Sequence, residues 1–336
     1  MPHPDYAFRD ISEYVRFGTA SDRYATWRGQ IYTSQWDDAV KMRTKKFGKN
    51  TFREETVPVA STEEYFEHFG IVELDFTFYN PLIKEDGEPS GSFFTVLQYA
   101  KHAPANARFL LKAPQLYSAR KFYRGKWVGN DNYLNVQGMN ERFVEPALEL
   151  LDERLTGVLF QQEYTRKADA PSPDENIAEL DAFFADVIQN TQFHLEIRSP
   201  HLHGDGYHDW LRSRGLGYVL SHSTWQKPLH TQWKQAGKAP SAANGETVVR
   251  LLTPLTKKYN EAYALTHPFD KAVPEIADSA GGQAMVQDSV ALIQDAIDSH
   301  KTINMIANNR AWGNAPDLTK EIVERLRERD VIATPN

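Results

Sequence analysis

Carboxylates and an amine occur at spacings in this chain that suit acid/base or nucleophilic chemistry. Glu73 and Asp75 alternate with apolar residues, and Glu196 lies in a second apolar stretch. Two carboxylates in different environments can act as general acid and general base, as they do in glycosidases. Lys112 ends a third apolar stretch, where an amine serves either as a Schiff-base nucleophile or as a clamp for an anion. Tyr79 can donate a proton or stack on a ring.

These residues need an element that brings them together. Residues 71–79 alternate strictly between apolar and polar types, which predicts a strand with Glu73, Asp75, Thr77 and Tyr79 on one side. In a barrel, the apolar side of a strand packs under outer helices and the polar side points into the lumen. We therefore interpret this stretch as the second strand of a barrel.

The rest of the chain alternates strands and helices in the same rhythm, which is typical of parallel βαβ units. The eight predicted strands cover residues 14–21, 71–79, 107–114, 157–162, 193–198, 217–223, 248–252 and 302–309. This pattern predicts an α/β fold of the (β/α)8 TIM-barrel class, with extended βα loops 1 and 3 at about 22–60 and 115–136. A doubly wound open sheet is the alternative, but no Gly-x-Gly-x-x-Gly or Gly-x4-Gly-Lys-Ser/Thr follows the first strand.

Local signals predict where several helices begin and end. Ser61 with Glu64, and Ser172 with Glu175, have the spacing of capping boxes, and Gly215 ends a short helix. We expect one domain over residues 1–336, with the barrel at about 14–330 and a loose segment at 1–12.

Composition excludes several classes of protein. The 336 residues carry a net charge of −7, which gives no general attraction to nucleic acid or anionic membranes. The chain has no cysteine, which excludes disulfides and thiolate chemistry and fits a cytoplasmic location. It also has no secretory signal and no apolar run of membrane-spanning length, so we expect no membrane association.

Several stretches together resemble one family. Its motifs are matched by Phe17–Ser21 with Trp27-Arg28-Gly29 and Tyr32, by Val72–Tyr79, Phe109–Pro114, Leu159–Gln161 and Leu195–Arg198, and by Asn308-Asn309. This chain is similar to domain of unknown function 72, the YecE-like proteins, over nearly its whole length. The resemblance implies a TIM barrel with a site, and no particular reaction. Asp75 stands where the family has Asn, Ser199 where it has His, and Leu251-Leu252 departs from Arg-x-His-Gly, which indicates a divergent branch.

In TIM barrels the site lies at the carboxyl ends of the strands. The expected catalytic residues there are Glu73, Asp75, Glu196, Lys112 and Tyr79, and the expected substrate-binding residues are Thr19, Trp27, Gln161, Arg198, Arg250 and Asn308. Buried charges are costly unless they are paired. A purely structural lattice of ion pairs is therefore the alternative interpretation of the same residues.

Two basic loops are expected to cover this face. Residues 41–53 contain six cations and no acid, and residues 120–127 interleave four cations with three aromatic side chains, including Arg120, Arg124 and Trp127. Such loops would concentrate positive potential over the mouth and favour an anionic ligand. The candidate ligands are a phosphorylated small molecule, a nucleotide and a nucleic-acid strand. The alternative is that these charges are merely solvated.

Metal chemistry has weaker support. His201, His203 and His208 follow the fifth strand, and His194 and His222 lie on strands five and six. Histidines at strand ends serve as metal ligands in TIM-barrel enzymes, but this chain has no His-Glu-x-x-His motif. We predict no cofactor and no metal site, and keep a divalent metal on His194 and His222 as the alternative.

The favoured function is an enzyme, with hydrolase, lyase or isomerase chemistry, that acts on an anionic small molecule bearing phosphate or carboxylate. The first alternative is a nucleic-acid-binding or metal-dependent nuclease-like barrel. The second is a ligand-binding barrel without catalysis. No oligomeric state is predicted.

Overall fold

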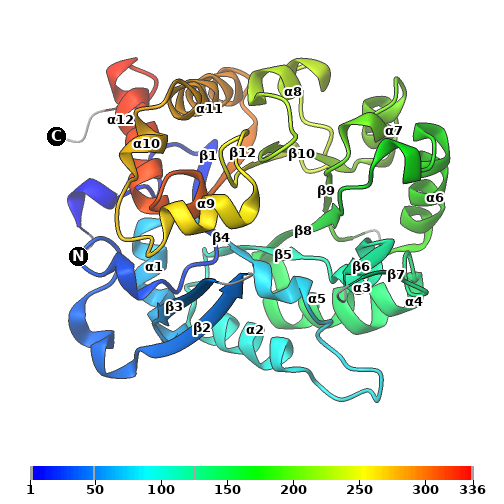
Figure 1. Ribbon diagram of the computed structural model, residues 1–336, viewed down its shortest axis with the longest axis horizontal. Coiled ribbons are helices and arrows are strands. Elements are labelled where there is room, and N and C mark those ends of the chain that lie inside the picture. The colour runs from blue at the N-terminus through cyan, green and yellow to red at the C-terminus, as the bar shows by residue number, and fades with distance from the viewer. Residues whose placement is uncertain (1–2, 48–49, 124–125, 189, 334–336) are drawn as a thin grey trace.

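Eight parallel strands close into a barrel in this computed structural model, which describes residues 3–47, 50–123, 126–188 and 190–333 (Figure 1). The strands are β1 (Val15–Ala20), β4 (Ile71–Leu74), β5 (Arg108–Lys112), β8 (Leu155–Gln162), β9 (Phe193–Ile197), β10 (Gly217–His222), β11 (Glu246–Leu251) and β12 (Thr302–Ala307). They pair in the order β1-β12-β11-β10-β9-β8-β5-β4, and β4 pairs with β1 to close the ring. The predicted (β/α)8 barrel is confirmed.

Helices accompany the strands, most of them on the outside of the ring (Figure 1). They are α1 (Thr62–His68), α2 (Gly91–His102), α3 (Gln115–Ser118), α4 (Val136–Met139), α5 (Glu145–Leu151), α6 (Pro173–Asp186), α7 (Tyr207–Arg214), α8 (Leu229–Gln235), α9 (Tyr259–Thr266), α10 (Pro274–Ala277), α11 (Ala280–Asp298) and α12 (Ala315–Glu328). Within the described ranges, none of them combines the length and the apolar run needed to cross a membrane.

The predicted helix ends have mixed outcomes. Ser172 and Glu175 form the expected capping box at the start of α6, and left-handed Gly215 ends α7. The capping box predicted at Ser61 is wrong, because Ser61 is itself helical and its hydroxyl donates to the Pro58 carbonyl. Glu64 instead accepts hydrogen bonds from the loop at Thr33.

The extended loops after β1 and β5 are confirmed, and each holds a hairpin that the sequence did not predict. The first hairpin consists of β2 (Lys41–Phe47) and β3 (Asn50–Thr56), and the second of β6 (Lys121–Tyr123) and β7 (Trp127–Gly129). Both lie on the side of the barrel that faces the viewer in Figure 1, together with α9. This side is the carboxyl end of the strands, because all three elements belong to connections that leave those ends.

The lumen is filled in layers. One layer is an apolar cluster that consists of Ala20, Ile71, Leu110, Leu159, Val219, Val248 and Ile306. Two residues further along the same strands come polar side chains, such as Glu73 after Ile71 and Arg250 after Val248. Because alternate side chains of a strand share one face, these polar groups lie above the apolar layer, toward the mouth.

The predicted strand 71–79 is wrong beyond Leu74. The strand ends there and a 3-10 helix, Asp75–Phe78, follows it directly. The hydroxyl of Thr77 donates to the carbonyls of Leu74, at 2.9 Å, and Lys112, at 2.7 Å, which holds this turn against β5. Asp75, Thr77 and Tyr79 therefore do not share one face of a strand.

The segment before β1, which we expected to be loose, packs onto the molecule. Phe8 is buried against Phe69, and its amide donates to the carbonyl of His68 at 3.0 Å. Tyr6 donates to Asp317 of α12 at 2.9 Å. These contacts hold residues 3–12 against α1 and α12.

His194 occupies the lumen between two glycines of neighbouring strands. A β-carbon on Gly217 would lie 2.1 Å from its ring nitrogen Nδ1, and one on Gly157 would lie 2.9 Å from its Cδ2. The imidazole thus takes space that side chains on β8 and β10 would otherwise fill.

This packing predicts the effect of a single methyl group. Gly217→Ala should lower the free energy of unfolding by about 1–3 kcal/mol, because the methyl group overlaps the imidazole. His194→Ala should relieve much of that loss in the double variant, measured by urea unfolding. Gly18→Ala is the matched control. Its methyl group would meet the backbone oxygen of Ile71 at 2.1 Å, so His194→Ala should not relieve the loss that it causes. Equal losses from Gly217→Ala with and without His194 would contradict the proposed contact.

Candidate functional site

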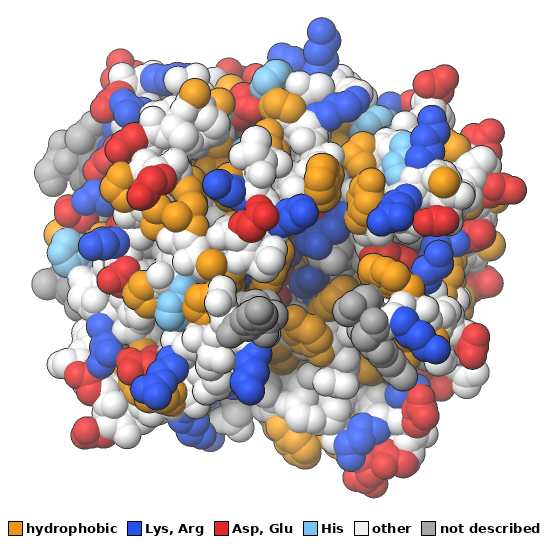
Figure 2. All heavy atoms as spheres, in the orientation of Figure 1, with side chains coloured by type: hydrophobic (Ala, Val, Ile, Leu, Met, Phe, Trp, Pro, Cys, Tyr) orange, Lys and Arg blue, Asp and Glu red, His pale blue; other side chains and the backbone are white. Residues whose placement is uncertain are grey.

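A cavity of about 370 Å³ opens at the mouth of the barrel. Figure 2 shows this face hollowed near its middle, with lysine and arginine side chains gathered in the hollow. Its described lining residues are Ala20, Glu73, Asp75, Phe78, Tyr79, Lys112, Gln161, Tyr164, Arg198, Ser223, Thr224, Trp225, Arg250, Leu252, Thr253, Lys258, Tyr259, Asn308 and Arg310. This volume lies within the range of small-molecule sites.

The floor of the cavity is a buried ion triad. Arg250 of β11 donates two hydrogen bonds to the carboxylate of Glu73, from Nε at 2.8 Å and from Nη2 at 2.6 Å. Its Nη1 donates to Glu196 of β9. All three residues are at most 3% exposed. One guanidinium therefore neutralises carboxylates on two different strands, a geometry that lysine cannot supply.

Glu196 stays ionised at every physiological pH. Burial opposes its charge, but the guanidinium of Arg250, helped by Arg198 and Lys112, lowers its pKa to about 2. Ser221 of β10 also donates to this carboxylate at 3.0 Å, and the Nε of Arg198 lies 3.4 Å from it. Burial opposes the charge of Arg250 as well, but Glu196 and Glu73 outweigh it and raise the pKa of Arg250, which holds it as a cation.

Lys112 lies at the end of β5, 8% exposed, with its amine in the cavity. Among the described residues, no hydrogen bond or ion pair is formed by this amine. Its Nζ lies 4.0 Å from the centre of the Phe78 ring. Burial, followed by the positive charge of Arg250, lowers the pKa of Lys112 to about 7, although Glu73 and Asp75 act in the opposite direction. The amine is therefore partly neutral at neutral pH.

Cations outnumber carboxylates around the cavity. Its lining includes Lys112, Arg198, Arg250, Lys258 and Arg310 as cations. The carboxylates are Glu73 and Asp75 in the lining, with Glu196 beneath it. The two glutamates are bound by Arg250, and Asp75 accepts a hydrogen bond from Ser21 at 2.6 Å. Within the described chain, Arg310 forms no ion pair, and its guanidinium stacks on Tyr259 at 4.4 Å.

Gln161 and Asn308 complete the polar lining. Gln161 is 5% exposed, and its side-chain oxygen has no hydrogen-bond partner in the described part of the chain. Asn308 accepts a hydrogen bond from the amide of Arg310 at 3.0 Å, which orients the turn that carries the guanidinium. A buried amide oxygen without a donor is costly, so this oxygen of Gln161 has capacity to accept a hydrogen bond from a ligand.

Comparison with known proteins agrees with this architecture. The family model described as "Protein of unknown function DUF72" matches residues 16–336, which is nearly the whole chain. This chain belongs to the DUF72 family. A search of curated proteins found no match.

Solved DUF72 structures resemble this one in fold. A DUF72 family protein from Thermotoga maritima superposes with a TM-score of 0.55 at 14% identity, covering 94% of this chain and 100% of the other. One from Enterococcus faecalis gives a TM-score of 0.53 at 14% identity, covering 94% and 99%. At this identity the likeness shows the shared TIM-barrel fold and nothing about activity.

Most of the expected site residues of this DUF72 protein line the cavity or its floor, but Thr19 and Trp27 do not. Thr19 is fully buried and its hydroxyl donates to the carbonyl of Ser21, with the hydroxyl of Tyr65 at 2.9 Å. Trp27 is fully buried beside Tyr32. Both residues are in contact with the core, and they are absent from the cavity lining.

The two basic loops contribute less to the cavity than we expected. Lys45 pairs with Glu54 on the opposite strand of its own hairpin at 3.1 Å, and Arg120 pairs with Glu179 of α6 at 2.6 Å. Trp127 is exposed and lines a neighbouring pocket that shares Tyr164 with the mouth cavity. Arg124 lies outside the described residues. The cations that line the mouth come from other segments.

The histidines considered as metal ligands have other environments. His194 lies in the barrel packing, where burial lowers its pKa to about 4. The Nδ1 of His222 lies 2.9 Å from the carbonyl oxygen of Thr253. In the described ranges, no group of three or more His, Asp or Glu side chains is arranged to hold a metal ion.

Several lining residues escaped sequence analysis because they follow the strands instead of lying on them. Trp225 and Tyr164 stack with their rings 6.4 Å apart at the rim, and Trp225 is 62% exposed with a left-handed backbone (φ 73°). Arg310 and Tyr259 form a second pair there. The sequence offers a signal for one of these lining residues: Arg310 comes two residues after Asn308, just past the end of a strand.

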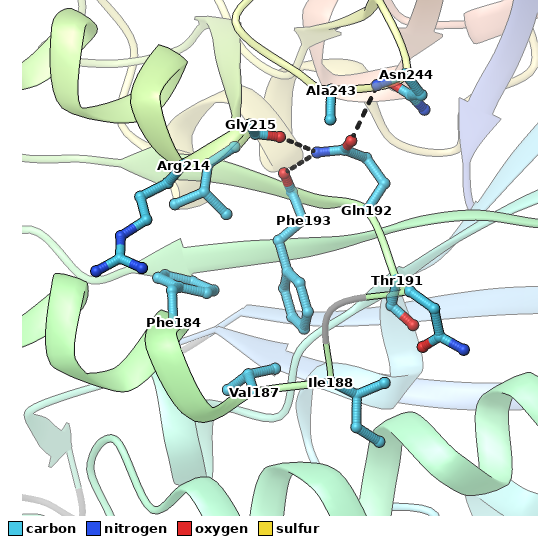
Figure 3. Close-up of a pocket in the computed structure, with 12 residues that line it drawn as sticks. Phe184, Val187, Ile188, Thr191, Gln192, Phe193, Arg214, Gly215, Ala243 and Asn244 are labelled. Atoms are coloured by element: carbon cyan, nitrogen blue, oxygen red, sulfur yellow. Dashed lines mark hydrogen bonds between the residues drawn. The ribbon is translucent and has the colours of Figure 1, made fainter.

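A second pocket, of about 240 Å³, lies at the amino ends of β9 and β10 (Figure 3). The Nε2 of Gln192 donates there to the carbonyls of Phe193, at 2.8 Å, and Gly215, at 3.0 Å. Arg214 is the one titratable group among its described lining residues, and it pairs with Asp181. The mouth cavity is therefore the stronger candidate site.

The triad predicts a pH-dependent loss of stability when its cation is removed. Arg250→Met should lower the free energy of unfolding at pH 7 by about 3–5 kcal/mol, because two buried carboxylates lose their partner. The loss should shrink at pH 5, since Glu196 without Arg250 is protonated more easily and protonation removes the buried charge. Urea unfolding at both pH values measures it.

The matched variant is Glu73→Gln/Arg250→Met/Glu196→Gln, which should recover most of the lost stability because no buried charge remains. A loss from Arg250→Met that is the same at pH 5 and pH 7 would contradict the assignment.

The depressed pKa of Lys112 predicts a second pH effect. In the unfolded chain the amine has a pKa of about 10.4, so between pH 7 and 10 the unfolded state binds more protons than the folded state. The free energy of unfolding of the wild type, minus that of Lys112→Met, should therefore rise with pH across this window, by up to about 1.4 kcal/mol per pH unit. A difference that is flat from pH 7 to 9 would show that Lys112 has an ordinary pKa.

Proposed function

We propose that this protein is an enzyme that binds an anionic small molecule, bearing phosphate or carboxylate, at the mouth of the barrel and transfers protons there. The observation that carries the proposal is the amine of Lys112, which is buried in the cavity and has no carboxylate partner in the part of the chain that the structure describes. A purely structural lattice of ion pairs would leave no such amine, since both neighbouring glutamates are bound to Arg250. A buried cation without an anionic partner is energetically unfavourable, and a bound anionic ligand would supply that partner.

Different charged residues have different roles in this proposal. Arg198 and Arg310 hold the anion together with protonated Lys112. The third guanidinium, Arg250, is bound through three nitrogens to Glu73 and Glu196, whereas Arg198 approaches Glu196 only through Nε, at 3.4 Å. Glu196 remains an ion, so it orients Arg250 and transfers no proton. In this proposal Glu196 therefore has a positioning role, in place of the acid/base role expected from the sequence.

Proton transfer falls to Lys112 and Asp75. A group with a pKa near 7 is well suited to exchange protons at neutral pH, and Lys112 has such a pKa. Asp75 lies at the start of the 3-10 helix in the cavity wall, where Ser21 orients its carboxylate. The side-chain oxygen of Gln161 can accept a hydrogen bond, and no described residue donates one to it.

The aromatic rim favours a small molecule with an apolar face. Tyr164 and Trp225 present stacked rings on the cavity wall, and Tyr259 presents another under Arg310. Stacked aromatic rings exclude water from one side of a ligand and strengthen its interactions with the cations below. A cavity of about 370 Å³ suits a small molecule better than a duplex nucleic acid.

Sulfate is a suitable probe, because its charge does not change between pH 6 and pH 8. Isothermal titration should show wild-type affinity falling about tenfold over this range, since binding needs protonated Lys112 and its pKa is near 7. Lys112→Arg should bind with little pH dependence, and Lys112→Met should bind weakly at both pH values.

Lys301→Met is the control, because Lys301 is exposed just before β12, at the amino end of the barrel. It should behave as the wild type does. Sulfate binding that Lys112→Met leaves unchanged, or no binding by any variant, would refute the proposed anion site.

A further inference from the structure

We infer that Lys112 is a covalent catalyst, whose amine condenses with the carbonyl group of an anionic aldehyde or ketone to form an imine. This rests on the proposed anion site and adds a reacting group to the ligand, which then carries both an anionic group and a carbonyl carbon.

The position of the amine supports this role. Nucleophilic lysines are activated by desolvation or by a neighbouring cation, both of which keep the amine neutral. Lys112 has both, since it is 8% exposed and lies close enough to Arg250 and Arg198 for their charges to act on it. The two buried glutamates, which would otherwise hold it as an ammonium ion, are bound to Arg250.

The surroundings also hold the amine in place. Phe78 packs beneath it at 4.0 Å, and the turn that carries Phe78 is fixed by the hydrogen bond from Thr77 to the backbone carbonyl of Lys112. The amine therefore has a defined position in the cavity wall. Lys258 also lines the cavity, but it is exposed and lies at the start of α9, on the rim.

The reaction balances without any redox partner. The lone pair of the Lys112 nitrogen attacks the carbonyl carbon, the carbonyl oxygen takes up a proton and the nitrogen loses one, giving a carbinolamine. The oxygen then takes up a second proton and leaves as water, while the nitrogen lone pair forms the C=N bond of a protonated imine. Asp75 and Tyr79, which line the same cavity, are the groups available to carry these protons. The protonated imine withdraws electrons from the adjacent carbon, as lysine-dependent carbonyl enzymes require.

The experiment traps the imine by reduction. Pyridoxal 5′-phosphate combines an aldehyde with a phosphate, and glyoxylate combines an aldehyde with a carboxylate in a much smaller molecule. The full-length protein is incubated with each probe at pH 7, treated with sodium cyanoborohydride, digested and mapped by mass spectrometry. Lys112 should be modified at least about tenfold faster than Lys258, because an exposed lysine is almost entirely protonated at this pH.

Further arms separate this inference from the anion site. Sulfate should slow the labelling of Lys112 and leave exposed lysines such as Lys301 unaffected. Lys112→Arg, checked for folding by circular dichroism, should lose the selective adduct and keep sulfate binding. Sulfate binding in the wild type without selective labelling of Lys112 by either probe overturns the imine and leaves the anion site standing. Loss of both overturns the proposed function as well.

Discussion

The contact between Arg250 and the two glutamates is the constraint on which the site depends. Three charges are buried at the end of the lumen, where each one alone would be strongly unfavourable. They are tolerated because one planar guanidinium has enough donors to satisfy carboxylates from β4 and β9 at once. The triad thus links three strands across the ring. It also binds both of these glutamates, so the amine of Lys112 forms no ion pair with any carboxylate of the described residues, although Asp75 lines the same cavity.

The layered lumen explains which parts of this site the sequence could predict. Glu73, Lys112, Gln161 and Arg250 each come two residues after a member of the apolar cluster, so alternation along a strand carries them to the mouth. That rule needs the chain to remain extended. It fails at Asp75, where the strand has ended and a 3-10 helix begins, held by the Thr77 hydroxyl. It also does not apply to Trp225 and Arg310, because these residues come after their strands.

The basic loops show why a run of charge along the sequence is a poor guide to the electrostatics of a cavity. The run from Lys41 to Arg53 folds back on itself, and the acidic residues that follow it, Glu54 and Glu55, are paired in register with Arg43 and Met42. Arg120 is neutralised by Glu179, which lies on a helix 59 positions later in the chain. Glu179 is too far along the chain to be recognised as a partner of Arg120, and Glu54 becomes one only through a hairpin that the sequence did not predict. The excess positive charge at the mouth comes instead from single cations on five separate segments.

The two roles proposed for Lys112 require opposite protonation states, and this limits the kind of ligand that suits the cavity. An ammonium ion attracts an anion, whereas only the neutral amine attacks a carbonyl. A pKa of about 7 keeps both forms populated at neutral pH. An anionic group bound directly against the amine would raise that pKa and suppress attack. A productive ligand must therefore place its charge on Arg198 and Arg310, at the cavity wall, and its carbonyl carbon at Lys112. The spacing between those groups, more than the total charge of the mouth, then selects the substrate.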